Sequence, residues 1–180
     1  MNIFEKMLRT RKLLLLGEIN SSIVETLISL IETMKLDGVT EAKLMINCRG
    51  GSVESALHLY AAIVESEIDF TGEVVANCKS SAVTVLQACK TRVALLDSSF
   101  LIHNTRRRFD EFLDISSPVE FYIEKLKKSY ADGYDMNMRN QKALSARIKM
   151  KKLYEDFLVS GDNFSSEIAL RMGLIDKIVH

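Results

Sequence analysis

The sequence predicts an α/β fold in which strands and helices alternate along one chain. Three observations lead to this fold class: short apolar runs, amphipathic runs of helical length between them, and glycine or serine at the junctions. Strands that alternate with helices of about 10 to 15 residues indicate repeated βαβ units. Such units build a largely parallel sheet with right-handed crossovers.

The first elements show this alternation most clearly. Residues 12–16 form an expected strand that ends at Gly17, and Ser21 or Ser22 is expected to cap the following helix. The predicted apolar face of that helix consists of Ile23, Leu27, Leu30, Ile31 and Met34. The pattern then occurs twice more. A strand over 43–48 precedes a Gly50-Gly51 turn and a helix over 53–65, and a strand over 73–76 precedes a helix over 81–88.

The second half of the chain begins with two short strands, over 92–96 and 99–103. From Pro118 to about residue 160 the sequence is helical and charged, with Gly133 as the expected break between two helices. The predicted apolar positions of these two helices are Val119, Tyr122, Leu126 and Tyr130, then Leu144, Ile148 and Leu153. A protruding long-helix handle over roughly 105–160 is therefore expected. A helix over 165–172 and a strand over 175–179 close the chain.

Size and composition limit the classes of protein to consider. The 180 residues, 47% of them hydrophobic, suffice for a single domain, 1–180, with its own core. The formal net charge is zero, and the arginines at 106–108 lack interleaved aromatic residues, so no nucleic-acid partner is expected. No apolar run approaches the roughly 20 residues that span a bilayer, and no signal peptide is recognisable. Three cysteines without CxxC spacing indicate reduced thiols in the cytoplasm and no metal site.

Four positions could carry chemistry, although each also has an ordinary structural explanation. Gly50-Gly51 either lets backbone N–H groups approach a ligand or only makes a tight turn. Ser81 lies where a helix begins, so an oxyanion would be stabilised there, but an isolated Ser80 or Ser81 at this place is more often simply a helix cap. His103 ends an apolar strand, and Asp162 precedes a short helix, where it could also be a turn residue.

Taken together and in order, these positions resemble the proteolytic subunit of Clp protease, within the Clp/crotonase superfamily. Residues 47–53, Asn-Cys-Arg-Gly-Gly-Ser-Val, are similar to that family's Asn-Ser-Pro-Gly-Gly-Ser-Val turn, and 101–104, Leu-Ile-His-Asn, to its Met-Ile-His-Gln. Residues 162–167, Asp-Asn-Phe-Ser-Ser-Glu, and 173–176, Gly-Leu-Ile-Asp, resemble its closing blocks. The nucleophile block, Ala-Ala-Ser-Met-Gly-Ala, falls on residues 79–84, Lys-Ser-Ser-Ala-Val-Thr.

The resemblance implies a catalytic triad of Ser81 as nucleophile, His103 as general base and acid, and Asp162 as the group that orients the imidazole. It also implies an oxyanion hole made by the backbone N–H groups of Gly51 and Ala82, with neither metal nor cofactor.

The sequence also departs from the family at named positions. Val83 stands where a glycine usually follows the nucleophile by two residues, and Lys79 replaces a small apolar residue. The glycine-rich segment after the histidine, which lines the substrate channel in the family, is replaced by residues 105–114 with three arginines. Gly161 replaces an arginine that helps to join two rings, and the preceding region is longer. The family's unfoldase-docking tyrosines correspond to 43–46, Lys-Leu-Met-Ile, and only a short N-terminal stub precedes the first strand.

The expected function is that of a serine endopeptidase, ATP-independent or coupled to an unfoldase, which cleaves a peptide or protein substrate through an acyl-enzyme. By resemblance it would form a homo-oligomer of heptameric rings, with an ATP-dependent unfoldase or a co-subunit as further partner and no membrane association. Two alternatives stay open. The chain could be a non-proteolytic structural subunit of a mixed ring, or a crotonase-type acyl-CoA enzyme.

Overall fold

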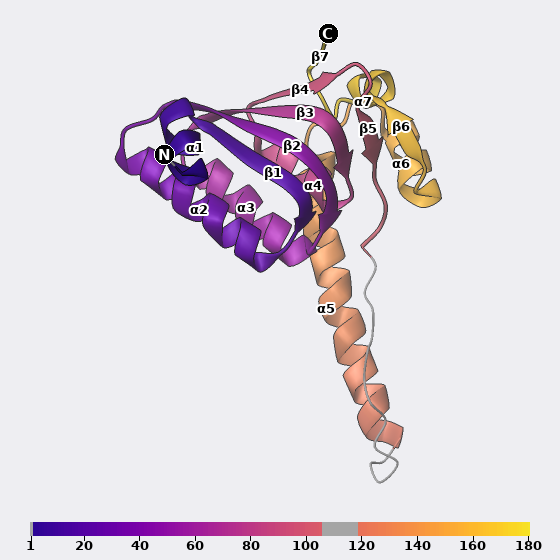
Figure 1. Cartoon of the computed structure of the whole chain (residues 1–180). Helices are drawn as coiled ribbons and strands as arrows, with labels where there is room; N and C mark the ends of the chain where they lie inside the picture. Colours follow the sequence, from indigo (N-terminus) through magenta and orange to yellow (C-terminus); the bar gives the residue numbers. More distant parts are fainter. Residues whose placement is uncertain (1, 106–118) are drawn as a thin grey trace.

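A computed structural model describes residues 2–105 and 119–180, which form a mixed α/β structure around one seven-stranded sheet (Figure 1). The predicted α/β class is therefore confirmed. In chain order the described elements are α1 (Ile3–Thr10), β1 (Lys12–Ile19), α2 (Ser21–Leu36), β2 (Glu41–Gly51), α3 (Val53–Glu65), β3 (Asp69–Lys79), α4 (Ser81–Ala88), β4 (Thr91–Leu95), β5 (Ser99–Leu101), α5 (Val119–Ser145), α6 (Lys151–Ser160), β6 (Asn163–Ser165), α7 (Ser166–Met172) and β7 (Lys177–Val179). The arginines at 106–108, Pro118 and nearly all of segment 105–114 lie outside the described residues.

Strand β3 divides the sheet into two parts. Strands β1, β2, β3, β4 and β7 are adjacent in that order, and every pair among them is parallel. The first half of β3 pairs with β4 from Thr71 to Val74, whereas its last residues, from Asn77 to Lys79, pair with β5. Strand β6, which the sequence analysis did not anticipate, adds to β5 in the antiparallel direction. The carboxyl end of β3 is thereby placed beside β5 and β6.

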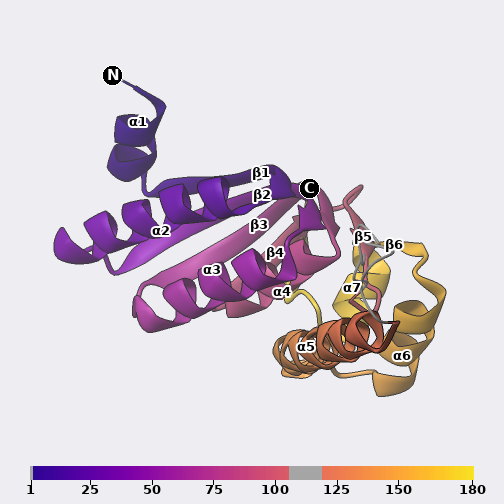
Figure 2. The same ribbon diagram turned by 90° about the horizontal axis from the view of Figure 1, so that it is seen from below.

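Helix α2 shows how apolar spacing fixes the packing of the first layer. Figure 2 shows α2 and α3 side by side along one face of β1 to β4. Four of the five predicted apolar positions of α2 are buried, and Ile23 is partly buried. The cap is Asn20 rather than Ser21 or Ser22, because the Asn20 side chain accepts a hydrogen bond of 3.0 Å from the N–H of Ile23.

The short N-terminal segment before β1 forms a helix, which the sequence analysis did not anticipate. Asn2 and Glu5 make a capping box, in which the Asn2 side chain accepts from the Glu5 N–H and the Glu5 carboxylate accepts from the Asn2 N–H. No residue of α1 is buried, and Ile3 and Phe4 are about half exposed. The capping-box spacing is a sequence signal for this helix, but a helix so short contributes little to an apolar pattern.

The handle is present, but its break lies elsewhere than expected. Helix α5 runs without interruption through Gly133, and the chain turns only after Ser145, before α6 begins. Figure 1 shows α5 extending away from the sheet, and its buried residues, Asn140, Ala143 and Leu144, lie near its carboxyl end. A glycine inside a helix costs only about 1 kcal/mol, so good helix formers on either side can outweigh it.

Candidate active site

The three segments that carry the predicted triad meet at one edge of the sheet. Lys79 lies opposite Leu101 in the β3–β5 register, and the Ser80 N–H donates to the Leu101 carbonyl at 2.8 Å. Leu101 in turn lies opposite Asn163 in the antiparallel β5–β6 pair. Residues just beyond these pairs are therefore neighbours in space. A Cβ built on Gly161 would lie 3.8 Å from the His103 Cβ, so the segment that carries Asp162 runs beside the histidine.

Ser81 is the first residue of α4, and its side chain is enclosed. The residue is only 1% exposed, and its hydroxyl donates to the Gly51 carbonyl at 3.2 Å. This bond joins the beginning of α4 to the Gly-Gly turn at the end of β2. The hydrogen bond therefore holds α4 and the end of β2 together.

Ser80 occupies the N-cap position of α4 with an unusual backbone conformation. Its φ of 52° and ψ of −129° lie outside the regions that residues with a side chain normally adopt. The side chain makes no capping hydrogen bond, and the residue is half-buried. Such a conformation costs on the order of 1–3 kcal/mol and persists only where the surroundings impose it. The sequence marks this position only as a candidate cap.

The Gly-Gly turn packs so closely against this junction that side chains are excluded. A Cβ on Gly50 would lie 2.7 Å from the Ser80 Cβ and 3.1 Å from the Ser81 nitrogen. A Cβ on Gly51 would lie 2.2 Å from the Ile19 carbonyl oxygen. Both glycines also have positive φ, 92° and 145°. The backbone of the turn therefore lies directly against the N-terminus of α4, where the first N–H groups have no intrahelical acceptor.

His103 and Asp162 lie near this junction, but the His103 side chain contacts another group and the Asp162 side chain does not reach the imidazole. The His103 Nδ1 lies 2.5 Å from the Asn104 carbonyl oxygen, so a neutral ring that donates there keeps Nε2 free as an acceptor. Asp162 is exposed, and its backbone N–H donates to the Ser160 hydroxyl at 3.2 Å. Among the described residues, no hydrogen bond links the side chains of Ser81, His103 and Asp162 to one another.

The cysteines do not compete as nucleophiles at this edge. All three are free and buried. Burial raises the pKa of the Cys89 thiol to about 12, and burial also raises the pKa of Cys78 and of Cys48. A thiol whose pKa is raised is rarely ionised at neutral pH and is therefore a poor nucleophile. Within residues 2–105 and 119–180, no cluster of three metal-ligating side chains occurs, and no helix has the length and apolarity needed to cross a membrane.

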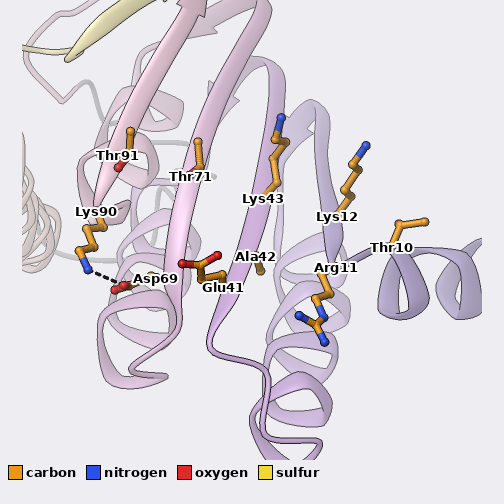
Figure 3. A pocket seen from close by; sticks show the side chains of 10 residues that line it. All are labelled: Thr10, Arg11, Lys12, Glu41, Ala42, Lys43, Asp69, Thr71, Lys90 and Thr91. Carbon is orange, nitrogen blue, oxygen red and sulfur yellow. Dashed lines mark hydrogen bonds and ion pairs between the residues drawn. The ribbon is translucent and has the colours of Figure 1, made fainter.

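A separate hollow of about 500 Å³ lies at the opposite end of the strands, among their amino-terminal residues (Figure 3). Its ten lining residues are Thr10, Arg11, Lys12, Glu41, Ala42, Lys43, Asp69, Thr71, Lys90 and Thr91. None of them is aromatic. The hollow is polar: Lys90 forms an ion pair with Asp69 inside it, and Lys43 forms one of 2.5 Å with Glu73, which lies outside the lining.

Comparison with known proteins places this arrangement in a family. Among solved structures, the chain is similar to a point mutant of ClpP1 from Listeria monocytogenes, with a TM-score of 0.82 and 16% sequence identity. That alignment covers 99% of this chain and 96% of the other, so the two share a fold. A search of curated proteins finds no match. The sequence matches the Clp protease family over residues 1–180, and the chain therefore belongs to that family.

Proposed function

We propose that the protein is a serine peptidase, with its nucleophile in the Ser80–Ser81 pair, His103 as general base and Asp162 as the orienting carboxylate. The resemblance to the family points to Ser81 within that pair. The observation that carries the proposal is the convergence of three segments, because the Ser80 N–H donates to Leu101 and Leu101 pairs with Asn163. A serine, an imidazole and a carboxylate are thereby carried on neighbouring backbone at the ends of three strands.

The proposed reaction proceeds in two halves. The serine oxygen attacks the carbonyl carbon of the scissile bond, and its proton passes to Nε2 of His103. The C–N bond then breaks, and the amine leaves with that proton. Water, deprotonated by the same nitrogen, next cleaves the acyl-serine ester, so the peptide acid is released and the serine regains its proton. Backbone N–H groups of the Gly51 turn and of the first turn of α4 would hold the oxyanion in both halves.

The orienting role of Asp162 requires a local change in hydrogen bonding. His103 directs Nδ1 to the Asn104 carbonyl, whereas orientation by Asp162 would direct the same Nδ1–H to a carboxylate oxygen. Residues 161–163 lie beside His103, so a rotation of the ring and of the exposed Asp162 side chain would make this exchange.

An active-site label separates this proposal from its two alternatives. A fluorophosphonate probe should add once per chain in intact-mass measurement, and short peptides should be hydrolysed. A structural subunit of a mixed ring would take up no label. A crotonase-type enzyme would instead turn over an acyl-CoA thioester without covalent labelling of a serine.

We further propose that the handle joins copies of the chain into rings, heptameric by resemblance to the family. Leu126, Tyr130 and Tyr134 follow one another at intervals of four residues on α5, so they share one side of the helix. All three are more than half exposed, at 52%, 74% and 57%. A row of large apolar side chains on a projecting helix is typical of a surface that another chain covers.

Negative charge on this row of apolar side chains of α5 should disrupt the assembly of chains into rings. We expect the double variant Leu126→Glu and Tyr130→Glu to sediment as a smaller species than the wild type, because burial of two carboxylates against apolar side chains is costly. Lys128→Glu is the matched control, since residue 128 lies on the opposite side of the helix from both positions. Equal sedimentation coefficients for the double variant and the wild type would contradict this use of the handle.

Coupling to a typical Clp unfoldase is expected to be weak. By resemblance, residues 43–46 stand where the family has its docking tyrosines, and the hollow that Lys43 lines contains no aromatic residue among its ten. Aromatic anchors dominate the binding energy at such surfaces. We therefore expect ATP-independent hydrolysis of short peptides, without stimulation by such an unfoldase.

The assay combines the purified protein, a Clp unfoldase, ATP and a tagged folded substrate. A Clp peptidase that carries the docking tyrosines serves as the positive control. ATP-dependent degradation of the folded substrate by this chain alone would show that the expectation is wrong.

A further inference from the structure

We propose that Ser80, and not Ser81, is the nucleophile of the serine peptidase, an inference that rests on the function proposed above. The two serines are adjacent, but their surroundings differ completely. Ser80 lies at the strained junction between β3 and α4, whereas Ser81 lies inside the first turn of α4. Three features of these surroundings distinguish a reactive hydroxyl from a structural one.

The first feature is a backbone strain at Ser80 that no capping hydrogen bond from its side chain offsets. With φ at 52° and ψ at −129°, Ser80 occupies a region in which glycine is strongly preferred. The hydroxyl offers no compensation as a cap, because it makes no capping hydrogen bond to α4. A glycine would therefore fit this position better. A side chain kept in a strained strand-to-helix turn is the arrangement by which a nucleophilic serine is held out toward substrate.

The second feature is that the Ser81 hydroxyl already has a hydrogen-bond partner. Its hydroxyl is already a donor to the Gly51 carbonyl at 3.2 Å, and the residue is 1% exposed. Attack on a substrate carbonyl from Ser81 would require that this bond break and that the first turn of α4 open. Ser80 is half-buried and needs neither change. Ser81 is therefore a positioning residue, which fixes the Gly-Gly turn against α4.

The third feature is the location of the backbone donors. If Ser80 attacks, the N–H of the next residue, Ser81, becomes the oxyanion donor that accompanies the N–H of Gly51. A Cβ at Gly50 would lie 3.1 Å from the Ser81 nitrogen, so the absence of a side chain lets the Gly-Gly turn lie directly against the backbone at Ser81. The Val83 N–H already donates to the Ser80 carbonyl at 3.0 Å, which begins the helix.

The test uses a fluorophosphonate probe on the full chain. In the labelling step the serine oxygen bonds to phosphorus, the P–F bond breaks, fluoride leaves, and the serine proton passes to His103. We expect Ser80→Ala to lose the adduct and Ser81→Ala to keep it, at a rate lowered by no more than about tenfold through the lost hydrogen bond. Fragmentation of the labelled wild type should place the added mass on Ser80, a result that does not depend on whether either variant folds.

The possible results separate this inference from the function on which it rests. An adduct on Ser81 of the wild type would overturn the assignment and leave the serine-peptidase proposal in place. A wild type without any adduct would overturn both. Loss of labelling in Ser80→Ala with the wild-type adduct on Ser80 supports both.

Thermal unfolding provides a readout that is independent of labelling. Ser80→Gly should relieve the strain and raise the Tm by about 2 to 6 °C while it abolishes the adduct. Ser81→Gly should lower the Tm, because it removes a buried hydrogen bond and weakens the first turn of α4. A Ser80→Gly variant with a lowered Tm would show that the Ser80 side chain has a structural role, which counts against the assignment.

Discussion

Replacement of His103 by alanine is expected to lower the rate of peptide hydrolysis by about 100- to 10,000-fold. The imidazole takes the serine proton during attack and returns it to the leaving amine, so both halves of the proposed reaction depend on it. The rate of fluorophosphonate labelling should fall with the hydrolysis rate, because the label requires the same deprotonation. The measurement compares kcat/KM for a short fluorogenic peptide between the variant and the wild type.

His58 supplies the matched control for this variant. It is an exposed histidine in α3, outside the three segments that meet at the candidate active site. His58→Ala should therefore keep its hydrolysis rate within a factor of about two of the wild type, since surface changes of this kind have small effects. A His103→Ala variant as active as His58→Ala would contradict the general-base role.

Replacement of Arg92 by alanine is expected to be the most destabilising change discussed for this chain. Arg92 is 1% exposed, and its guanidinium donates to Asp176, to the Gln87 side chain and to the Gly173 carbonyl. The variant leaves the buried Gln87 side chain and the Gly173 carbonyl without this donor, whereas Asp176 is 31% exposed and keeps its ion pair with Arg147. We therefore expect a cost of about 3 kcal/mol, the lower end of the range for breaking a buried pair, and a fall in Tm of roughly 6 to 12 °C for a chain of this size.

Lys90, two residues earlier, is the control for the Arg92 variant. Its ion pair with Asp69 is exposed, with 66% and 47% of the two side chains accessible. An exposed pair contributes at most about 1 kcal/mol, so Lys90→Ala should shift the Tm by only a few degrees. Equal unfolding temperatures for the two variants would contradict this expectation. They would show that the hydrogen bonds from Arg92 to Gly173 and Asp176 do not hold the C-terminal segment to β4.

The stability that Asp176 contributes should depend on pH. Partial burial pushes the pKa of Asp176 upward, but hydrogen bonds from Arg92 and the positive charges of Arg92 and Arg147 outweigh it and hold that pKa below its ordinary value. A carboxyl group with a lowered pKa stabilises the fold above its unfolded pKa, and the contribution is lost as the pH falls through the folded pKa. The difference in unfolding free energy between wild type and Asp176→Asn, measured in urea, should therefore shrink from about pH 4 downward.

The elements that the sequence predicted correctly are those fixed by local pattern. The spacing of Leu27, Leu30, Ile31 and Met34 is a helical face because one turn takes about 3.6 residues, and all four are buried. The continuation of α5 through Gly133 was missed because the propensity of one residue is weak against its neighbours. The burial of Arg92 was missed because its partners lie up to 84 residues away in the chain.

The sequence predicts the segments of the candidate active site, whereas the choice between two adjacent serines as the proposed nucleophile rests on the structure. The order of Gly-Gly turn, serine pair, histidine and aspartate is visible in the sequence, and the segments that carry these residues meet in the structure. The proposed choice of Ser80 over Ser81 depends mainly on a backbone torsion at the β3–α4 junction, which hydrophobic spacing does not predict. One sequence signal does bear on it. The small residue two positions after Ser80 is Ala82, whereas Val83 follows Ser81 at that distance.

Rapid-quench intact-mass measurement with an activated peptide ester is the most direct test of the central claim, which is covalent catalysis by a serine at the β3–α4 junction. The account predicts a burst of leaving group equal to about one per active chain, with a transient acyl adduct that fragmentation assigns to Ser80. The adduct should be absent in Ser80→Ala and should form much more slowly in His103→Ala. Hydrolysis of the ester by the wild type without a burst or an acyl adduct, at a rate unchanged in Ser80→Ala and Ser81→Ala, would contradict the account.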